Sequence, residues 1–529
     1  MSITMPTRRQ LLSMIGHAAG TTAMYQAMTS MGFAATSDYS GPIELAGSQG
    51  GTKVLILGAG LAGLTAAYEL RKAGYDVKVL EYQNRGGGRS WTISGGDSFT
   101  ELGGHDVDCT FEKGYLNPGP WRLPIHHYAV FDYCRKFNVP LQPFIMKNNK
   151  AYLHNSQAYG GKPQRIGDVE TDIRGYTSEL LAKSVQQGAL DEQVSAEDQE
   201  KLLEGLKGWG VLDKNYRYVT SEAVGEHRGW DVLPGGGLMP KAEPSTPLDF
   251  GPLLNSGLWE QLYVFNEYVH APAMFEPVGG MGRIGDAFTE QTRDLIRFNA
   301  RVSKIEQNEG QVTVHYEDRE GGGEVMQETA DYCICTIPLS ILAQLEIDVS
   351  DEMKRAIASV PYASAFKVAL EFKRRFWEQD EWIVGGISYT DLPIKQIAYP
   401  SYDLFEDGPG VVQAAYDTYP TKNYTYTWNT LTPQERIEAA LEFGSRIHPQ
   451  YREEFISGTS CAWHRIPWTL GCYGQWTEEL REEHYETLCE FDGRIALAGE
   501  HCSHIPAWQE GAILSGLDVI RRLDARVNA

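Results

Sequence analysis

The feature that most constrains the fold of this chain is a strand, turn, helix and strand at residues 53–81, KVLILGAGLAGLTAAYELRKAGYDVKVLE. An apolar strand leads into GxGxxG, a helix with apolar residues at helical spacing follows, and a second strand ends at Glu81. This order is typical of a parallel sheet covered by helices, with a dinucleotide bound at the first turn. The sequence therefore predicts a Rossmann-type dinucleotide-binding domain.

The three glycines of the motif have separate physical roles. Gly58 permits the tight turn, Gly60 lets the backbone approach a pyrophosphate, and Gly63 allows close packing of helix on strand. The helix N-terminus presents free N–H groups to the anion, and Glu81 can accept hydrogen bonds from the ribose hydroxyls. A glycine-rich turn without a ligand is the alternative. The predicted nucleotide-binding residues of this segment are Gly58, Gly60, Leu61, Ala62, Gly63, Glu81 and Tyr82.

Further segments resemble the flavin amine oxidases. Residues 84–92, NRGGGRSWT, are similar to the RxGGRxxT segment that follows the ribose-binding acid in that family. Residues 277–288 and 300–318 resemble its middle cofactor segment, and residues 494–523 resemble its closing strand and helix. The resemblance implies FAD as the cofactor. Non-covalent binding is expected, although Cys472 stands at a place similar to the cysteine through which monoamine oxidases attach flavin.

The resemblance also implies how these segments contact FAD. Arg89 would face the phosphates, because a guanidinium offers planar paired donors to phosphate oxygens. Glu500 would contact the ribityl or phosphate region, and Val302 would lie near the adenine. The helix that begins near Gly511 would point its N-terminus at flavin N1, where negative charge accumulates on reduction. The cofactor-binding residues implied in this way are Arg89, Gly119, Pro120, Trp121, Arg122, Val302, Glu500, Ala507, Trp508, Gly511 and Ala512.

One arginine stands in a proline-bounded segment, GPWRLP at residues 119–124. In L-amino-acid oxidases a similar segment carries the arginine that binds the substrate carboxylate. A guanidinium pairs with a carboxylate through two parallel hydrogen bonds, whereas a free amine has no need of a fixed cation. Arg122 is therefore the candidate carboxylate anchor, with Trp121 and the backbone of Gly119 and Pro120 against the flavin. An arginine that pairs with a structural acid is the alternative.

Three other residues complete the candidate catalytic and substrate-binding set with Arg122. Lys367, in an apolar strand-like run, resembles the lysine that holds a water beside flavin N5 in this family. Tyr473 and Trp508 match the pair of rings before the flavin in monoamine oxidases, where they would flank the reacting amine. A lysine whose ammonium reaches solvent, and rings that only fill the core, are the alternatives. The eight cysteines form no CxxC pair, and no metal site is expected.

The resemblance is to the L-amino-acid oxidase branch of the flavin amine oxidases. It implies oxidative deamination, in which hydride passes from Cα to flavin N5 and an L-amino acid and oxygen yield a 2-oxo acid, ammonia and hydrogen peroxide. A polyamine or monoamine oxidase, and a flavin amino-acid monooxygenase, are the enzymatic alternatives. An FAD-binding scaffold is the alternative outside enzymes. Which amino acid is preferred stays open.

At 529 residues the chain is too long for one core, so interleaved domains are expected. The predicted fold class is mixed α/β, a Rossmann-type FAD-binding domain interleaved with a β-sheet substrate domain and a helical insertion. The predicted FAD-binding domain comprises residues 51–120, 277–345 and 455–529; the substrate domain comprises residues 121–166, 270–276 and 346–454; the helical insertion is residues 167–269.

The first 35 residues contain Arg8 and Arg9 within TRRQLL and then a mildly apolar run. This pattern predicts a twin-arginine signal peptide and a periplasmic or secreted protein, with a frayed amphipathic tail as the alternative. With 70 acidic and 47 basic residues, the formal charge of -23 disfavours nucleic acid and anionic membranes as partners. No later segment is a membrane-span candidate. A homodimer is expected, as amine oxidases often pair.

Overall fold

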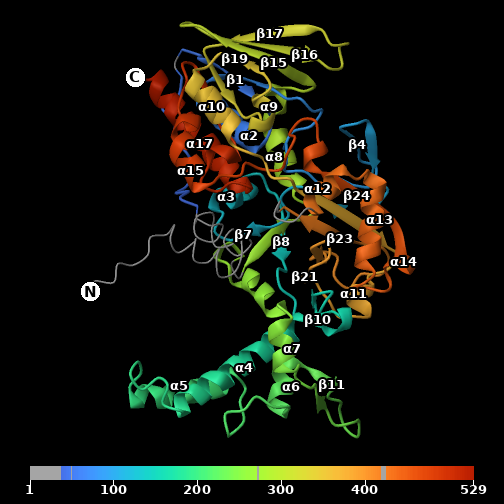
Figure 1. Ribbon diagram of the computed structural model, residues 1–529. Coiled ribbons are helices and arrows are strands. Elements are labelled where there is room, and N and C mark those ends of the chain that lie inside the picture. The colour runs from blue at the N-terminus through green and yellow to red at the C-terminus, as the bar shows by residue number, and fades with distance from the viewer. Residues whose placement is uncertain (1–36, 49, 271–272, 419–423) are drawn as a thin grey trace.

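The computed structural model describes residues 37–48, 50–270, 273–418 and 424–529 (Figure 1). The predicted signal peptide at residues 1–35 lies outside the described residues and stays a prediction. Within the described ranges, no helix combines the length and the apolar character that crossing a membrane requires.

A five-stranded parallel sheet forms the centre of the cofactor side, and it confirms the predicted Rossmann-type fold. In sheet order its strands are β14 (Ile296–Arg297), β2 (Asp76–Leu80), β1 (Lys53–Leu57), β18 (Tyr332–Cys335) and β25 (Ile495–Leu497). Each neighbouring pair runs parallel. The strands come from segments far apart in the sequence, so the domain is interleaved as the motif positions predicted.

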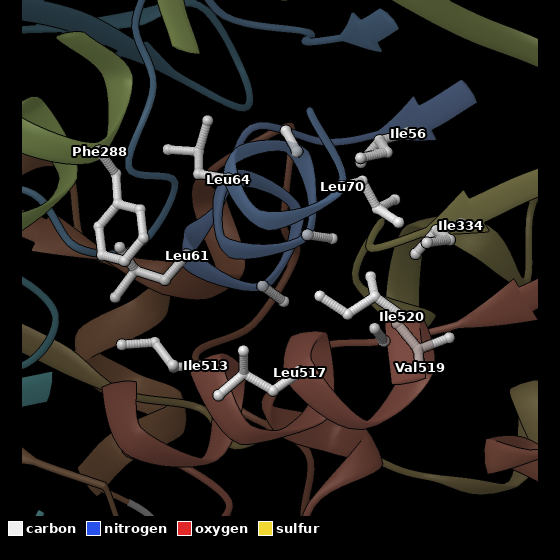
Figure 2. Close-up of a cluster of buried hydrophobic side chains, with 14 of the residues drawn as sticks. Ile56, Leu61, Leu64, Leu70, Phe288, Ile334, Ile513, Leu517, Val519 and Ile520 are labelled. Atoms are coloured by element: carbon white, nitrogen blue, oxygen red, sulfur yellow. The ribbon is translucent and has the colours of Figure 1, made fainter. Parts of the chain in front are cut away.

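Helix α2 (Leu61–Lys72) connects β1 to β2 and packs against the last helix of the chain, α17 (Gln509–Val527). Leu64, Leu517 and Ile520 belong to one buried apolar cluster between these helices and the parallel sheet (Figure 2). The helices can approach this closely because Gly516 has no side chain; a Cβ there would lie only 2.7 Å from the Ala62 carbonyl oxygen. The first and last cofactor motifs are thereby packed together.

A second sheet on the cofactor side has four strands in the order β17, β16, β15 and β19. The bounds are β17 Val325–Ala330, β16 Val312–Asp318, β15 Ala300–Gln307 and β19 Glu346–Ile347. Val302, the residue expected near the adenine, lies in β15. Helix α10 (Asp351–Ser359) contributes Met353, Ala356 and Ile357 to the core of this side.

The substrate side is built on a seven-stranded sheet in the order β10, β9, β21, β22, β23, β20 and β24. Its strands are β10 (Gln164–Arg165), β9 (Tyr152–His154), β21 (Ile387–Thr390), β22 (Gln396–Ala398), β23 (Gly410–Asp417), β20 (Phe366–Phe372) and β24 (Phe455–Ala462). Every residue of β20 is buried, with antiparallel partners on both edges. One of those partners is β24, which the sequence had assigned to the cofactor domain. Helix α13 (Pro433–Gly444) contacts β20, β23 and β24.

A small three-stranded sheet and a helical insertion are further parts of the molecule. Strands β7 (Leu123–Pro124), β13 (Met274–Pro277) and β8 (Leu141–Phe144) form one small sheet. The insertion projects away from the two large sheets (Figure 1). Its elements are α4 (Ile166–Gln186), α5 (Ala196–Trp209), α6 (Glu222–Arg228), β11 (Trp230–Val232), β12 (Glu243–Pro244) and α7 (Phe250–Asn255), and the 3-10 turns η2 (Leu258–Asn266) and η3 (Tyr268–His270) lead back to the substrate side.

Candidate functional site

A cavity of about 1410 Å³ is lined by residues of the parallel sheet, the seven-stranded sheet and the end of the insertion. Most of the residues singled out in the sequence border this one space. They are Gly58, Gly60, Leu61, Ala62, Glu81, Tyr82, Arg89, Gly119, Pro120, Trp121, Arg122, Val302, Tyr473, Glu500, Ala507, Trp508 and Ala512. Gly63, Gly511 and Lys367 lie behind its wall instead. The structure thus brings the whole set together, while the role of each residue stays a prediction.

The glycine turn at the start of α2 has the shape expected of a pyrophosphate cradle. Gly58 has a φ of +102°, and a Cβ there would lie 2.6 Å from Thr336 Oγ1. A Cβ on Gly63 would lie 2.1 Å from the Gly58 carbonyl oxygen, so helix and turn are in backbone contact. A Cβ on Gly60 would meet no described protein atom within 4 Å, because this residue faces the cavity. Backbone alone therefore borders the cavity at this point.

Two substitutions separate the role of packing from that of cofactor contact. We expect Gly63→Ala to lower the free energy of unfolding by about 1–3 kcal/mol, because the added methyl overlaps the Gly58 carbonyl. Gly60→Ala should leave stability within about 0.5 kcal/mol but weaken FAD binding at least roughly tenfold. Thermal unfolding and FAD titration measure the two effects. Equal loss of stability in both variants would contradict this division of roles.

Glu81 directly follows β2 and is buried beside the same turn. One carboxylate oxygen accepts a hydrogen bond from the Ala59 N–H at 2.6 Å and the other from the Gln83 N–H at 2.8 Å. Burial raises the pKa of this carboxyl, and these hydrogen bonds act in the opposite direction. The carboxylate braces the turn and also borders the cavity, where the sequence predicts ribose hydroxyls.

The glycine-rich segment at residues 85–89 packs directly on this turn. The Gly87 N–H donates to the Ala59 carbonyl at 2.8 Å, and Gly87 forms a parallel bridge with Gly60. A Cβ on Gly88 would lie 3.2 Å from the Gly60 Cα. The three consecutive glycines thus allow this segment to pack closely against the backbone of the turn at Ala59 and Gly60.

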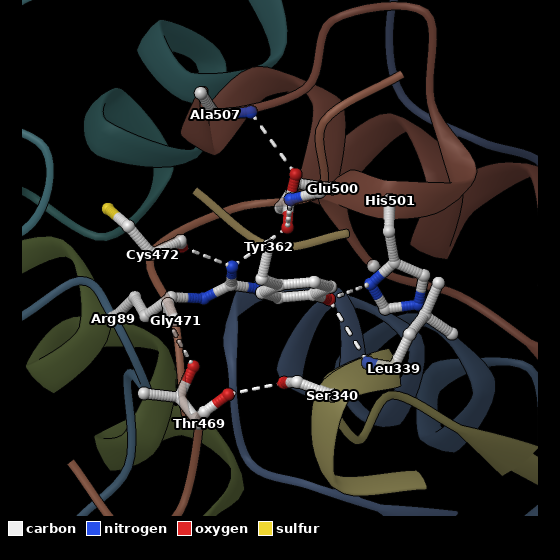
Figure 3. A network of polar contacts seen from close by, with 12 residues as sticks. Arg89, Leu339, Ser340, Tyr362, Thr469, Gly471, Cys472, Glu500, His501 and Ala507 are labelled. Carbon is white, nitrogen blue, oxygen red and sulfur yellow. Dashed lines mark hydrogen bonds and ion pairs between the residues drawn. The ribbon is translucent and has the colours of Figure 1, made fainter. Parts of the chain in front are cut away.

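Arg89 and Glu500, predicted separately as cofactor contacts, form an ion pair (Figure 3). An Arg89 Nη1 hydrogen is donated to Glu500 Oε1 at 2.8 Å, and the same nitrogen lies 2.6 Å from the Cys472 carbonyl oxygen. Glu500 also accepts hydrogen bonds from the backbone N–H groups of Gly474 and Ala507. This network links the first and last cofactor segments to residues 472–474 at one wall of the cavity.

The sequence did not identify two residues that support this network. The Tyr362 hydroxyl accepts from the Leu339 N–H and lies 3.1 Å from His501 Nδ1. The Arg89 guanidinium lies 5.9 Å from the centre of the Tyr362 ring. His501 directly follows Glu500 in the segment EHCSH, and this position next to a predicted cofactor contact could have identified it.

The last helix begins at the cavity, and its predicted direction toward the flavin stays a prediction. Trp508 precedes its first residue, and Ala512 borders the cavity from its first turn. A Cβ on Gly511 would lie 2.2 Å from the Ile505 carbonyl oxygen and 2.3 Å from Ser503 Oγ. Gly511 therefore allows the segment before α17 to fold back on the first turn of the helix.

At the other end of the cavity, Arg122 lies among aromatic rings. Its guanidinium is 4.7 Å from the Trp121 ring centre, and Nη2 lies 2.7 Å from His270 Nε2. Tyr473 and Trp508, the predicted ring pair, border the same space. Four tyrosines that the sequence did not single out also line this end, namely Tyr263, Tyr268, Tyr389 and Tyr416. The sequence signal that could have identified these tyrosines is the high density of aromatic residues in the segments that contain them.

Lys367 supports the segment that carries Trp121 and Arg122. Its Nζ donates to the Asn117 carbonyl at 2.8 Å and to the Gly119 carbonyl at 2.6 Å. The ammonium also lies 4.9 Å from the centre of the Trp121 ring. Burial lowers the pKa of Lys367 to about 7, and the positive charge of Arg122 acts in the same direction. An amino group whose pKa is about 7 is thus held directly behind the cavity wall.

Cys472 borders the cavity, as expected of a residue in question for covalent flavin attachment. Burial raises the pKa of its thiol to about 12. A thiolate, the reactive form, is therefore scarce near neutral pH. This favours FAD held without a covalent bond. In the described part of the chain, no group of His, Cys, Asp and Glu side chains is arranged to hold a metal ion.

The chain is similar to known proteins over most of its length. The family model described as "Flavin containing amine oxidoreductase" matches residues 61–523. The chain is 30% identical to the protein YobN of Bacillus subtilis (strain 168) over 490 residues, which are 90% of this chain and 95% of that protein. It is 31% identical to L-amino acid oxidase Bs29 of Bothriechis schlegelii over 483 residues, covering 88% and 89% of the two chains.

A solved structure with the same fold is the cyclohexylamine oxidase from Brevibacterium oxydans IH-35A. The TM-score is 0.59 at 15% identity, with 90% of this chain and 100% of that chain covered. At this identity the likeness concerns the fold. It confirms the mixed α/β class that the sequence predicted.

Proposed function

The chain belongs to the flavin containing amine oxidoreductase family, and from that premise we propose that it is an FAD-dependent L-amino-acid oxidase. The proposed reaction is oxidative deamination of an L-amino acid to a 2-oxo acid, ammonia and hydrogen peroxide. FAD, the cofactor of this family, supplies the chemistry by accepting hydride from Cα and passing two electrons to oxygen. The chain's own residues bind the substrate, orient it and keep water out.

The observation that carries the proposal is the place of Arg122. Arg122 borders the cavity two residues after Pro120, with its guanidinium beside the Trp121 ring and 2.7 Å from His270 Nε2. A partly desolvated guanidinium binds a carboxylate strongly, because both partners are charged and the hydrogen bonds are parallel. A substrate carboxylate can form such bonds with Arg122, whereas a simple amine has no group that can, which favours an amino acid.

The aromatic walls fit the remaining part of an amino acid. Tyr473 and Trp508 border the same cavity as Arg122, and we propose that they flank the ammonium group when the carboxylate is on Arg122. Ring faces attract a cation, and flat walls restrict how the Cα–H bond can approach the cofactor. We therefore propose Tyr473 and Trp508 as substrate-orienting residues and Lys367 as the residue that supports the carboxylate-binding segment.

A second candidate function is oxidation of an amine that lacks a carboxylate, because the Tyr473 and Trp508 rings on the cavity wall could bind its ammonium group equally well. Anaerobic mixing distinguishes the two, with each L-amino acid paired with the amine that its decarboxylation gives. We expect loss of the visible flavin absorption with amino acids and little loss with the matched amines. Loss with amines alone would favour an amine oxidase, and no loss with either would favour a scaffold. In air, hydrogen peroxide with a 2-oxo acid separates an oxidase from a monooxygenase.

The domain bounds, export by the twin-arginine route and a homodimer stay predictions of the sequence. The structure adds two points to the domain prediction. Strand β24 pairs with β20, and helix α10 packs in the core of the cofactor side. We therefore propose that the substrate domain extends to Ala462 and that α10 belongs with the cofactor domain.

A further inference from the structure

The insertion returns to the substrate side through η2 and η3, and its last described residue contacts Arg122. His270 ends η3, and its side chain is 7% exposed. On one side of the ring, Nε2 lies 2.7 Å from Arg122 Nη2. On the other side, Nδ1 lies 2.7 Å from the Val264 carbonyl oxygen. The imidazole therefore bridges the insertion and the candidate carboxylate anchor.

The two partners determine where the ring carries its hydrogen. A carbonyl oxygen can only accept, so Nδ1 must carry the hydrogen and donate to Val264. A guanidinium can only donate, so Nε2 must accept from Arg122. The Glu267 carboxylate, 3.3 Å from Nδ1, also favours a hydrogen on that nitrogen. The arrangement requires a neutral imidazole in one tautomer.

Burial agrees with that assignment. Burial, together with the charge of Arg122, lowers the pKa of His270 to about 3. The ring therefore stays neutral at any pH at which the protein is expected to work, and Nε2 remains an acceptor. The lone pair of Nε2 is engaged by Arg122, which argues against a role for His270 as the base that takes a proton from the substrate.

We propose that His270 is a positioning residue that fixes the direction of the Arg122 guanidinium and couples it to residues 258–270 of the insertion. The inference rests on the proposed function, because it assumes that Arg122 binds the substrate carboxylate. It gives the insertion a part in substrate recognition. The same segment places Tyr263, Val264 and Glu267 on the cavity wall, so an arginine held to it is aligned with the surface that meets the substrate.

The test is a double-mutant cycle between His270 and Arg122 in the FAD-loaded enzyme. We expect H270F to raise KM for the best L-amino acid ~10-fold with kcat changed less than ~2-fold, because a charge-assisted hydrogen bond is lost. H270Q should restore most of the affinity, since its side-chain carbonyl can accept from Arg122. In the R122M background, H270F should add less than ~2-fold, because a residue that acts through Arg122 has nothing left to position.

His227→Gln is the matched control, a change to an exposed histidine on α6 of the same insertion, and should leave KM unchanged. An unchanged KM in H270F, an equal effect of H270F with and without Arg122, or a fall confined to kcat would overturn the inference. If R122M itself leaves KM unchanged, the proposed function fails and the inference with it. If R122M raises KM and the cycle is additive, the inference alone fails. Should H270F lose FAD, H270A is used, and added imidazole must lower its KM.

Discussion

Replacement of Arg122 by methionine is expected to raise KM for L-amino acids ~100-fold or more, because truncating one partner of a desolvated charge pair costs about 2–5 kcal/mol. The value of kcat should change much less, since the guanidinium binds a group that does not react. The KM of Arg122→Lys should lie between those of the native enzyme and the methionine variant. An ammonium keeps the charge but lacks the planar pair of donors that matches a carboxylate. Steady-state kinetics with one amino acid measures all three proteins.

The matched amine, which lacks the carboxylate, is the informative second substrate for this variant. Its turnover should be unchanged or improved in R122M, so that the preference for amino acid over amine collapses. Arg355→Met, a change to an exposed arginine that pairs with Glu352 on α10, is the control for loss of a positive charge. Equal weakening of amine and amino acid in R122M would assign Arg122 a structural role and reject the carboxylate anchor.

The local part of this site could be predicted from the sequence because its physics is local. Gly58, Gly60 and Gly63 lie within one turn and one helix, and the alternation of strand and helix determines where the turn points. A positive φ at Gly58 and backbone contact at Gly63 are consequences of that short segment. Strand β20 could be predicted on the same basis, because a continuous apolar run indicates a strand buried on both faces.

The contacts that complete the site join residues far apart in the chain, and no periodicity specifies them. Arg89 and Glu500 were each predicted to bind cofactor. The ion pair between them joins residues 411 positions apart, and no sequence pattern indicates it. No local pattern in the sequence marks His270, because its two hydrogen bonds depend on how the insertion folds back. The pairing of β24 with β20 was missed for the same reason, since register between distant strands is a property of the assembled sheet.

Replacement of Lys367 by methionine is expected to lower kcat ~100-fold, with smaller effects on KM. Two buried carbonyls, of Asn117 and Gly119, would lose their donor, at a cost of about 1–3 kcal/mol each. The segment that carries Trp121 and Arg122 would then settle in a displaced position. A shift of about 1 Å in the reacting geometry is enough for a hundredfold loss of rate.

The same substitution has a signature in the dependence of stability on pH. The pKa of Lys367 is lowered by burial to about 7, whereas a lysine in an unfolded chain titrates near ~10.4. Between these values the unfolded state binds more protons, so the stability of the native enzyme should rise as pH rises through this window. Below pH about 7 the buried group is charged in both states and the full cost of burying the charge is present. Methionine does not titrate, so this contribution to the slope should be absent in Lys367→Met.

Thermal unfolding and kcat measured from pH 6 to about 10 test both expectations together. Lys373→Met is the matched control, because Lys373 follows β20 directly and is exposed, with its Nζ on the Glu453 carbonyl. That variant should keep the native pH slope and the native kcat. If Lys367→Met keeps the slope, its ammonium is not desolvated in the folded protein. If the slope disappears while kcat is unchanged, Lys367 contributes to the core alone, and the support of the Trp121–Arg122 segment does not depend on it.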